Sequence, residues 1–204
     1  MSISKFPEVI QAWVQVAQNS VLLVGPGNVS GNHAFAIGVQ AFLDTETAHA
    51  GTEFIIQGSL QESGFDNWND YKRIYPAGLV GMANEEAITN NPLVKWDTSI
   101  TVASTTGYTG IIDVALPQRA IKDGVNSEIV IQTAYTTNTN ITILGGSAFS
   151  HVATTKMYSL AVTFIEPIPV EYLRVRVIIN NKYDSDGSSL MARVTLGRVQ
   201  IVGE

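Results

Sequence analysis

Apolar and polar side chains alternate near the end of this chain, and this alternation restricts the possible folds more than any other feature. Residues 173–179 carry an aliphatic side chain at every second position, with Arg174 and Arg176 between them. Successive side chains of a strand point to opposite faces of a sheet, so this is the pattern of a half-buried β-strand. Residues 190–196 repeat it after a polar stretch. The two runs predict an antiparallel hairpin, with Gly197 at a bulge or bend.

Similar runs predict strands in the first third of the chain. Residues 33–44 and 52–60 alternate in the same way, and a polar connection containing Gly51 separates them. Residues 6–25 fit both a helix and a strand, because some apolar positions follow a helical stripe and others alternate as in a strand. We favour a strand for this segment.

The order of these patterns predicts an all-β chain with an insertion. A turn-rich stretch at 84–93 is followed by β signals about ten residues apart, which is the rhythm of a small barrel or sandwich. We therefore expect a jelly-roll-like antiparallel β-sandwich made of residues 1–95 and 160–204. Residues 96–159 are expected to form a small, barrel-like β subdomain inserted between them.

Charge and composition narrow the classes of partner. The chain has 12 Lys and Arg against 18 Asp and Glu, a net charge of -6, whereas binding to nucleic acid needs clustered cations. No apolar stretch is long enough for a membrane helix, and the N-terminal residues do not resemble a signal peptide. We expect a soluble protein made in the cytoplasm that binds neither nucleic acid nor membranes. Charged residues are only 15% of the chain against about a quarter in average proteins, which is typical of surfaces inside assemblies.

The motifs of catalysis and metal binding are missing from the sequence. There is no cysteine, and His33, His49 and His151 stand far apart without a partner at ligand spacing. No Gly-x-Ser-x-Gly motif is present, and residues 25–31 lack the lysine of a phosphate-binding loop. We expect no enzyme, no cofactor and no metal site.

Two polar segments allow a binding interpretation beside a structural one. Asp184 and Asp186 stand beside Gly187 like the start of a calcium loop, but the distal glutamate is absent and the same residues suit a hairpin turn. Arg174 and Arg176 are candidates for binding a partner's carboxylate, although pairing with acidic residues on neighbouring strands is the simpler interpretation.

Trp68 and Tyr71 are the candidate ligand-contact residues. They lie in a polar segment between strands, where exposed aromatic rings can stack on a sugar, and Asp66 and Asp70 are candidate acceptors for its hydroxyl groups. This is the pattern of a carbohydrate-binding module. The structural alternative is that Trp68 covers the edge of the core.

Three stretches resemble the small β-rich structural proteins of tailed bacteriophage virions, in particular capsid decoration or cement proteins. They are residues 49–74, the series 99–108, 126–135 and 139–146, and residues 172–194. The resemblance implies a non-enzymatic protein on the outside of an icosahedral capsid, which binds the major capsid protein and clamps neighbouring subunits.

The same resemblance implies a homotrimer at local three-fold positions, made in the host cytoplasm and located on the capsid surface of the virion. Residues 1 to about 24 are a candidate arm that becomes ordered on the capsid. A tail, baseplate or fibre component shares the same strand pattern and stays an alternative.

Overall fold

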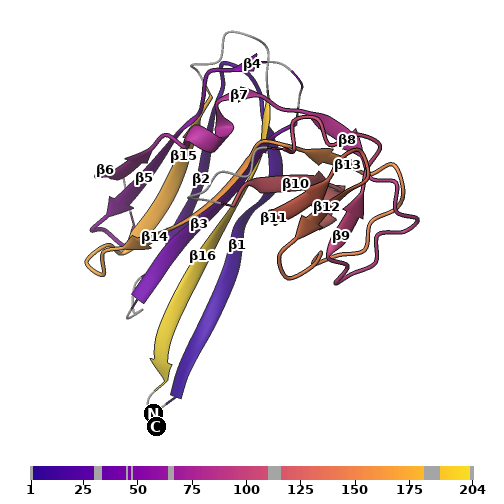
Figure 1. The fold of residues 1–204 in the computed structure, drawn as a ribbon. Helices are drawn as coiled ribbons and strands as arrows, with labels where there is room; N and C mark the ends of the chain where they lie inside the picture. Colours follow the sequence, from indigo (N-terminus) through magenta and orange to yellow (C-terminus); the bar gives the residue numbers. More distant parts are fainter. Residues whose placement is uncertain are drawn as a thin grey trace.

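The computed structural model shows an all-β chain (Figure 1). Apart from strands, the described residues contain two single-turn 3-10 helices, η1 (Ala77–Leu79) and η2 (Gly124–Asn126). No helix in this part of the chain is long and apolar enough to cross a membrane. The structure describes residues 2–29, 34–44, 46, 48–63, 67–109, 116–181 and 189–202.

Two four-stranded antiparallel sheets form a sandwich, as the alternation predicts. The first sheet has the order β1 (Ser2–Val16), β16 (Leu190–Val202), β3 (Ala34–Leu43), β14 (Ala161–Ile168). The second sheet has the order β2 (Val21–Asn28), β15 (Arg174–Asn180), β5 (Glu53–Ser59), β6 (Asn69–Ile74). A short pair, β4 (Ala48–His49) and β7 (Gly81–Met82), lies at one end.

The strand order is that of a jelly roll. The chain crosses from one sheet to the other at almost every connection, and β5 to β6 is the step that stays within a sheet. The last strand, β16, returns to lie between β1 and β3. Two four-stranded sheets connected in this way make the eight-stranded double-sheet jelly roll. The predicted fold class is confirmed.

A third, six-stranded sheet is made by the chain between β6 and β14, and we call it the inserted sheet. It curls into a half-barrel, and the bridge between Ile88 and Val102 brings its two edge strands together. The predicted domain boundaries, 1–95 with 160–204 and 96–159, stay a prediction. The strand order is β8 (Glu85–Ala87), β13 (Lys156–Tyr158), β10 (Gln118–Lys122), β11 (Glu128–Thr136), β12 (Asn140–Ile143), β9 (Ser99–Thr101).

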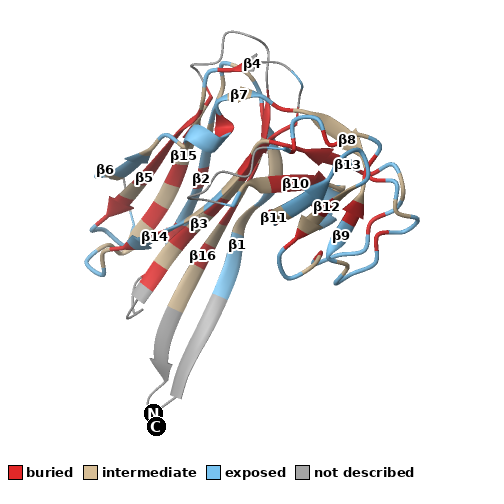
Figure 2. Ribbon diagram, in the orientation of Figure 1, coloured by how far each residue is buried: buried red, intermediate tan, exposed pale blue. Residues whose placement is uncertain are grey.

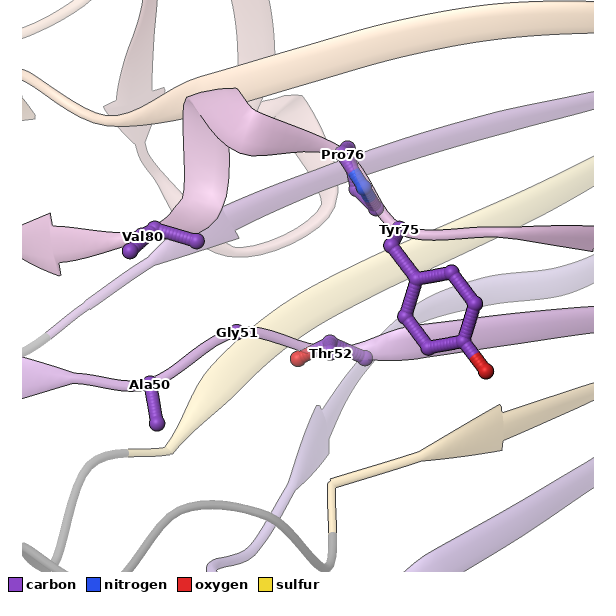
Figure 3. A pocket seen from close by; sticks show the side chains of 6 residues that line it. All are labelled: Ala50, Gly51, Thr52, Tyr75, Pro76 and Val80. Carbon is purple, nitrogen blue, oxygen red and sulfur yellow. The ribbon is translucent and has the colours of Figure 1, made fainter.

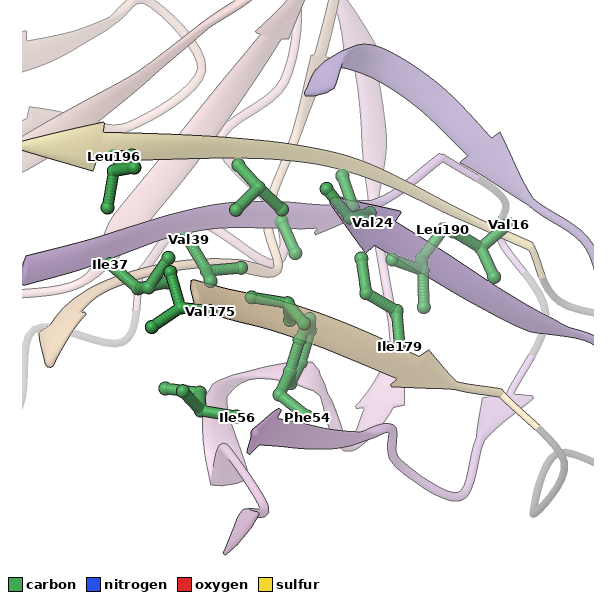
Figure 4. Close-up of a cluster of buried hydrophobic side chains, with 14 of the residues drawn as sticks. Val16, Val24, Ile37, Val39, Phe54, Ile56, Val175, Ile179, Leu190 and Leu196 are labelled. Atoms are coloured by element: carbon green, nitrogen blue, oxygen red, sulfur yellow. The ribbon is translucent and has the colours of Figure 1, made fainter. Parts of the chain in front are cut away.

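The main core fills the space between the two sheets of the jelly roll (Figure 4). Alternate residues of β15 and of residues 190–196 of β16 are buried, and the side chains between them are half-buried, so buried and intermediate positions alternate along the strands (Figure 2). Phe54 and Phe164 meet edge to face across this core with ring centroids 5.4 Å apart. The inward-facing residues of the last two strands are those that the alternation predicts: Val175, Val177, Ile179, Leu190, Ala192, Val194 and Leu196.

Three expectations about the ends of the chain are wrong. The runs 173–179 and 190–196 do not pair as a hairpin, because their apolar faces meet across the sandwich from different sheets. Gly197 pairs in register with Pro7 and Ala36, and the irregularities of β1 against β16 lie in β1 instead. The segment proposed as an arm forms β1 and the start of β2, held by hydrogen bonds to β16 and β15.

The inserted sheet packs against the outer face of the first sheet. The ring of Phe42 contacts Trp13 edge to face, with centroids 5.2 Å apart, and stacks on Tyr158 of β13 at 5.9 Å. The indole N–H of Trp13 donates to the carbonyl oxygen of Ser127 at 2.7 Å. The two parts therefore share a second, smaller apolar core.

Candidate functional sites

Trp68 lies against the two arginines that the sequence singled out. The Arg176 guanidinium is 4.2 Å from the centroid of the Trp68 ring, and that of Arg174 is 5.1 Å from it. Arg176 also donates to the side chain of Gln57 at 2.7 Å. Cations over an indole face are attracted by the ring's quadrupole. The half-buried Trp68 thus takes part in a stack with β15, and no sequence pattern indicates this contact.

Tyr71 lies on the other face of the second sheet. Its ring packs on the main core, and it meets Tyr172 edge to face at 6.2 Å. Its hydroxyl donates to Glu166 at 3.4 Å. Trp68 and Tyr71 therefore do not form one stacking surface for a sugar ring.

The acidic residues near these rings have other positions. Asp70 accepts hydrogen bonds from Gln57 and Arg73, which hold the pKa of Asp70 below its ordinary value. Asp66 lies outside the described residues, as do the loop residues Asp184 and Asp186 and the histidine His33.

Glu53, at the start of β5, is a buried carboxylate with three donors. Arg73 Nη1 donates to it at 2.6 Å, the Tyr75 hydroxyl at 2.5 Å and the Asn180 side-chain amide at 3.0 Å. Burial raises the pKa of Glu53, but these donors outweigh burial and hold the pKa below its ordinary value. These bonds join Glu53 of β5 to Arg73 of β6, to Tyr75 just after β6 and to Asn180 of β15.

The Glu53→Gln substitution is expected to cost about 1–3 kcal/mol of stability at neutral pH, because it weakens charge-assisted hydrogen bonds in a buried place. A lowered folded-state pKa gives stability that is present above the unfolded-state pKa and is lost as the pH falls through the folded-state pKa. The cost should therefore shrink in acid. Urea unfolding at several pH values measures it, and the exposed Glu171→Gln is the control, expected within about 0.5 kcal/mol of the parent. A cost independent of pH would contradict the assignment.

A hollow of about 440 Å³ lies beside Glu53, between β5 and η1 (Figure 3). Its polar side chains are the hydroxyls of Thr52 and Tyr75. Thr52 donates to Asn181 Oδ1 at 3.2 Å and lies 3.0 Å from Nε2 of the buried His49. The Thr52 hydroxyl therefore connects the buried side chains of His49 and Asn181. These contacts have the geometry of structural bonds.

His151 lies between two carboxylates in the inserted sheet. Its Nδ1 is 2.9 Å from Asp123 Oδ2 and its Nε2 is 2.7 Å from Glu128 Oε1. Burial lowers the pKa of His151, but the bonds to Glu128 and Asp123 outweigh burial and raise the pKa above its ordinary value. Glu128 also accepts from the backbone N–H of Ala148 at 2.7 Å. Within the described residues, no three His, Asp or Glu side chains are placed to hold a metal ion.

Exposed apolar side chains gather at two adjoining loops of the inserted sheet. Two hydrogen bonds join the loops. The Trp96 N–H donates to the Ser147 carbonyl oxygen at 2.9 Å, and the Ser147 hydroxyl donates to the Val94 carbonyl oxygen at 3.0 Å. Trp96 is 67% exposed and has a φ of 77°, which a tryptophan rarely adopts. Large exposed apolar groups of this kind mark contact surfaces. We call this group the apolar tip, and its residues are Val94, Trp96, Leu144 and Val152.

Comparison with known proteins shows weak similarities to viral capsid proteins. No protein-family model matches the sequence, and no curated protein matches it. The solved structure of VP17, a capsid protein of bacteriophage P23-77, is 8% identical, with 98% of this chain and 100% of that chain covered and a TM-score of 0.20. A structure of the infectious bursal disease virus Gt strain is 8% identical, with 97% and 42% covered and a TM-score of 0.27. TM-scores this low carry no conclusion about fold or function.

Proposed function

We propose that this chain is a structural protein of a virion shell. The observation that carries the proposal is the jelly-roll strand order, an architecture of viral capsid and lectin domains. The space between the two sheets is filled by buried apolar side chains, so the sandwich is a rigid block and not a container. The low share of charged residues suits a block with several protein neighbours. In this role the chain carries out no reaction.

The apolar tip is the surface that we assign to contact with the shell. Its exposed tryptophan, Trp96, is the type of residue that dominates interface energies, since tryptophan is enriched among hot spots. The lectin alternative has less support, because the arginines of β15 occupy the Trp68 ring and Tyr71 lies on the opposite face.

The finer role that we propose is that of a cement protein on the outside of a capsid. The chain would bind the major capsid protein and form a homotrimer, so that several modest contacts add up through multivalency. This part of the proposal rests on the resemblance to tailed-phage decoration proteins. A second candidate is a subunit that builds the shell itself, which the jelly-roll strand order favours. Treatment of particles with mild denaturant distinguishes the two candidates, because a cement protein would be released and would leave an intact shell behind.

Trp96→Ala is expected to raise the dissociation constant of the chain for purified particles about tenfold or more, since it removes the largest exposed ring of the apolar tip. Co-sedimentation of added protein with particles measures it. Ile165→Ala is the matched control, because Ile165 is 70% exposed but lies on β14 of the first sheet. Equal losses in the two variants, or none, would contradict the assignment of the tip.

A further inference from the structure

A hollow of about 550 Å³ lies where the first sheet of the jelly roll meets the inserted sheet, and we call it the junction hollow. Its walls come from η1, from residues 116–119 at the start of β10 and from residues 159–162 at the start of β14. Most of these residues are apolar or glycine. Arg119 is the charged residue in the lining.

Arg119 is a buried cation without an acidic partner among the described residues. It is 5% exposed and faces Tyr108, with its guanidinium 5.4 Å from the ring centroid. Its Nε donates to Gln132 Oε1 at 2.6 Å, and its Nη1 donates to the carbonyl oxygen of Ser159. A guanidinium has five N–H donors, so these two bonds leave donors unused at the wall of the hollow.

The charge of Arg119 persists in this position. Burial lowers the pKa of Arg119 to about 10, which keeps the group protonated at neutral pH. A charge removed from water is costly unless a counter-charge and hydrogen bonds compensate it. The arrangement therefore has one cation, spare donors and an adjoining space, and no described residue supplies the anion.

We propose that the junction hollow is a carboxylate-binding site in which Arg119 recognises the anion. Guanidinium groups bind carboxylates through two parallel N–H···O bonds. The apolar walls, which include Leu116, Pro117 and Val162, fit a short apolar body behind the carboxylate. A single cation in apolar surroundings suits a monoanion better than a phosphate dianion. This inference is independent of the virion role.

The carboxylate has two possible sources, a free small molecule or an acidic group of a second copy. Butyrate is the probe for the first source, with uncharged butyramide and sodium chloride at equal ionic strength as controls. Butyrate in excess is expected to raise the unfolding midpoint by about 2–4 °C through preferential binding to the folded chain. The second source, an acidic group of another copy, is tested without butyrate. If it occupies the site, the midpoint of the parent rises with protein concentration and the midpoint of Arg119→Met does not.

Three variants complete the experiment. Arg119→Lys keeps the charge without the planar fork and is expected to weaken butyrate binding about tenfold, and Arg119→Met is expected to abolish it. Arg174→Met removes an arginine on another strand and should leave the response unchanged. The inference is overturned if butyrate and butyramide shift the midpoint equally, or if neither butyrate nor protein concentration shifts it. Asp113 lies outside the described residues and is tested by substitution. The inference is also overturned if butyrate shifts the midpoint of Asp113→Asn but not that of the parent, since the chain's own carboxylate would then occupy the site.

Discussion

Replacing Phe54 with alanine is expected to lower the free energy of unfolding by about 3–5 kcal/mol, the usual cost of removing a buried aromatic ring. Phe54 is fully buried on β5, a central strand of the second sheet, and its ring meets Phe164 from the first sheet. Its removal leaves a cavity between the two sheets that their paired strands cannot easily close. Urea unfolding followed by tryptophan fluorescence measures the change.

Leu60→Ala is the control for Phe54→Ala. Leu60 follows directly after β5 and is 57% exposed, so its truncation should change stability by about 0.5 kcal/mol or less. Similar losses in the two variants would mean that the space between the sheets is not the main core.

Replacing His151 with leucine is expected to cost about 3–5 kcal/mol, because it leaves the buried carboxylate of Glu128 without its cation. The pKa of His151 is raised in the folded chain, so the stability that it contributes is complete below the ordinary pKa of histidine. That stability is lost as the pH rises through the folded-state pKa. The parent should therefore be less stable at about pH 9 than at about pH 6.

His151→Leu should remove most of this loss of stability at high pH. The two carboxylates are compared through Asp123→Asn and Glu128→Gln. The Asp123 side chain is 33% exposed against 9% for Glu128, so Asp123→Asn should cost less stability than Glu128→Gln. Unfolding curves over this pH range give both answers. A His151→Leu protein with the same pH profile as the parent would show that another group carries the effect.

The alternation along each strand identifies what is buried, but it does not identify the strand's neighbours. The inward-facing residues of β15 and β16 follow from a period of two, since that period is a local property of the backbone. Their sheets do not follow, because β16 pairs with β1 from the opposite end of the chain and β15 pairs with β2 and β5. Two strands adjacent in the sequence most simply pair as a hairpin, but in the jelly roll each of them pairs with strands far away in the sequence.

The candidate sites show the same division between local and distant information. Trp68 and the two arginines are visible as separate features, yet their stack arises only when β15 and β6 lie on either side of β5 in one sheet. His151 meets carboxylates 28 and 23 positions away, so no spacing rule reveals it. Arg119 carries no sequence signal, because its burial away from every described carboxylate is a property of the folded chain.

The copy number of this chain in purified virions tests the central proposal most directly. Quantitative mass spectrometry against a shell protein of known number gives it. A component of an icosahedral shell is expected at on the order of hundreds of copies per particle, since the shell's symmetry repeats each position many times. Absence from the particle, or about six or twelve copies as in a tail part, would contradict a place in the shell.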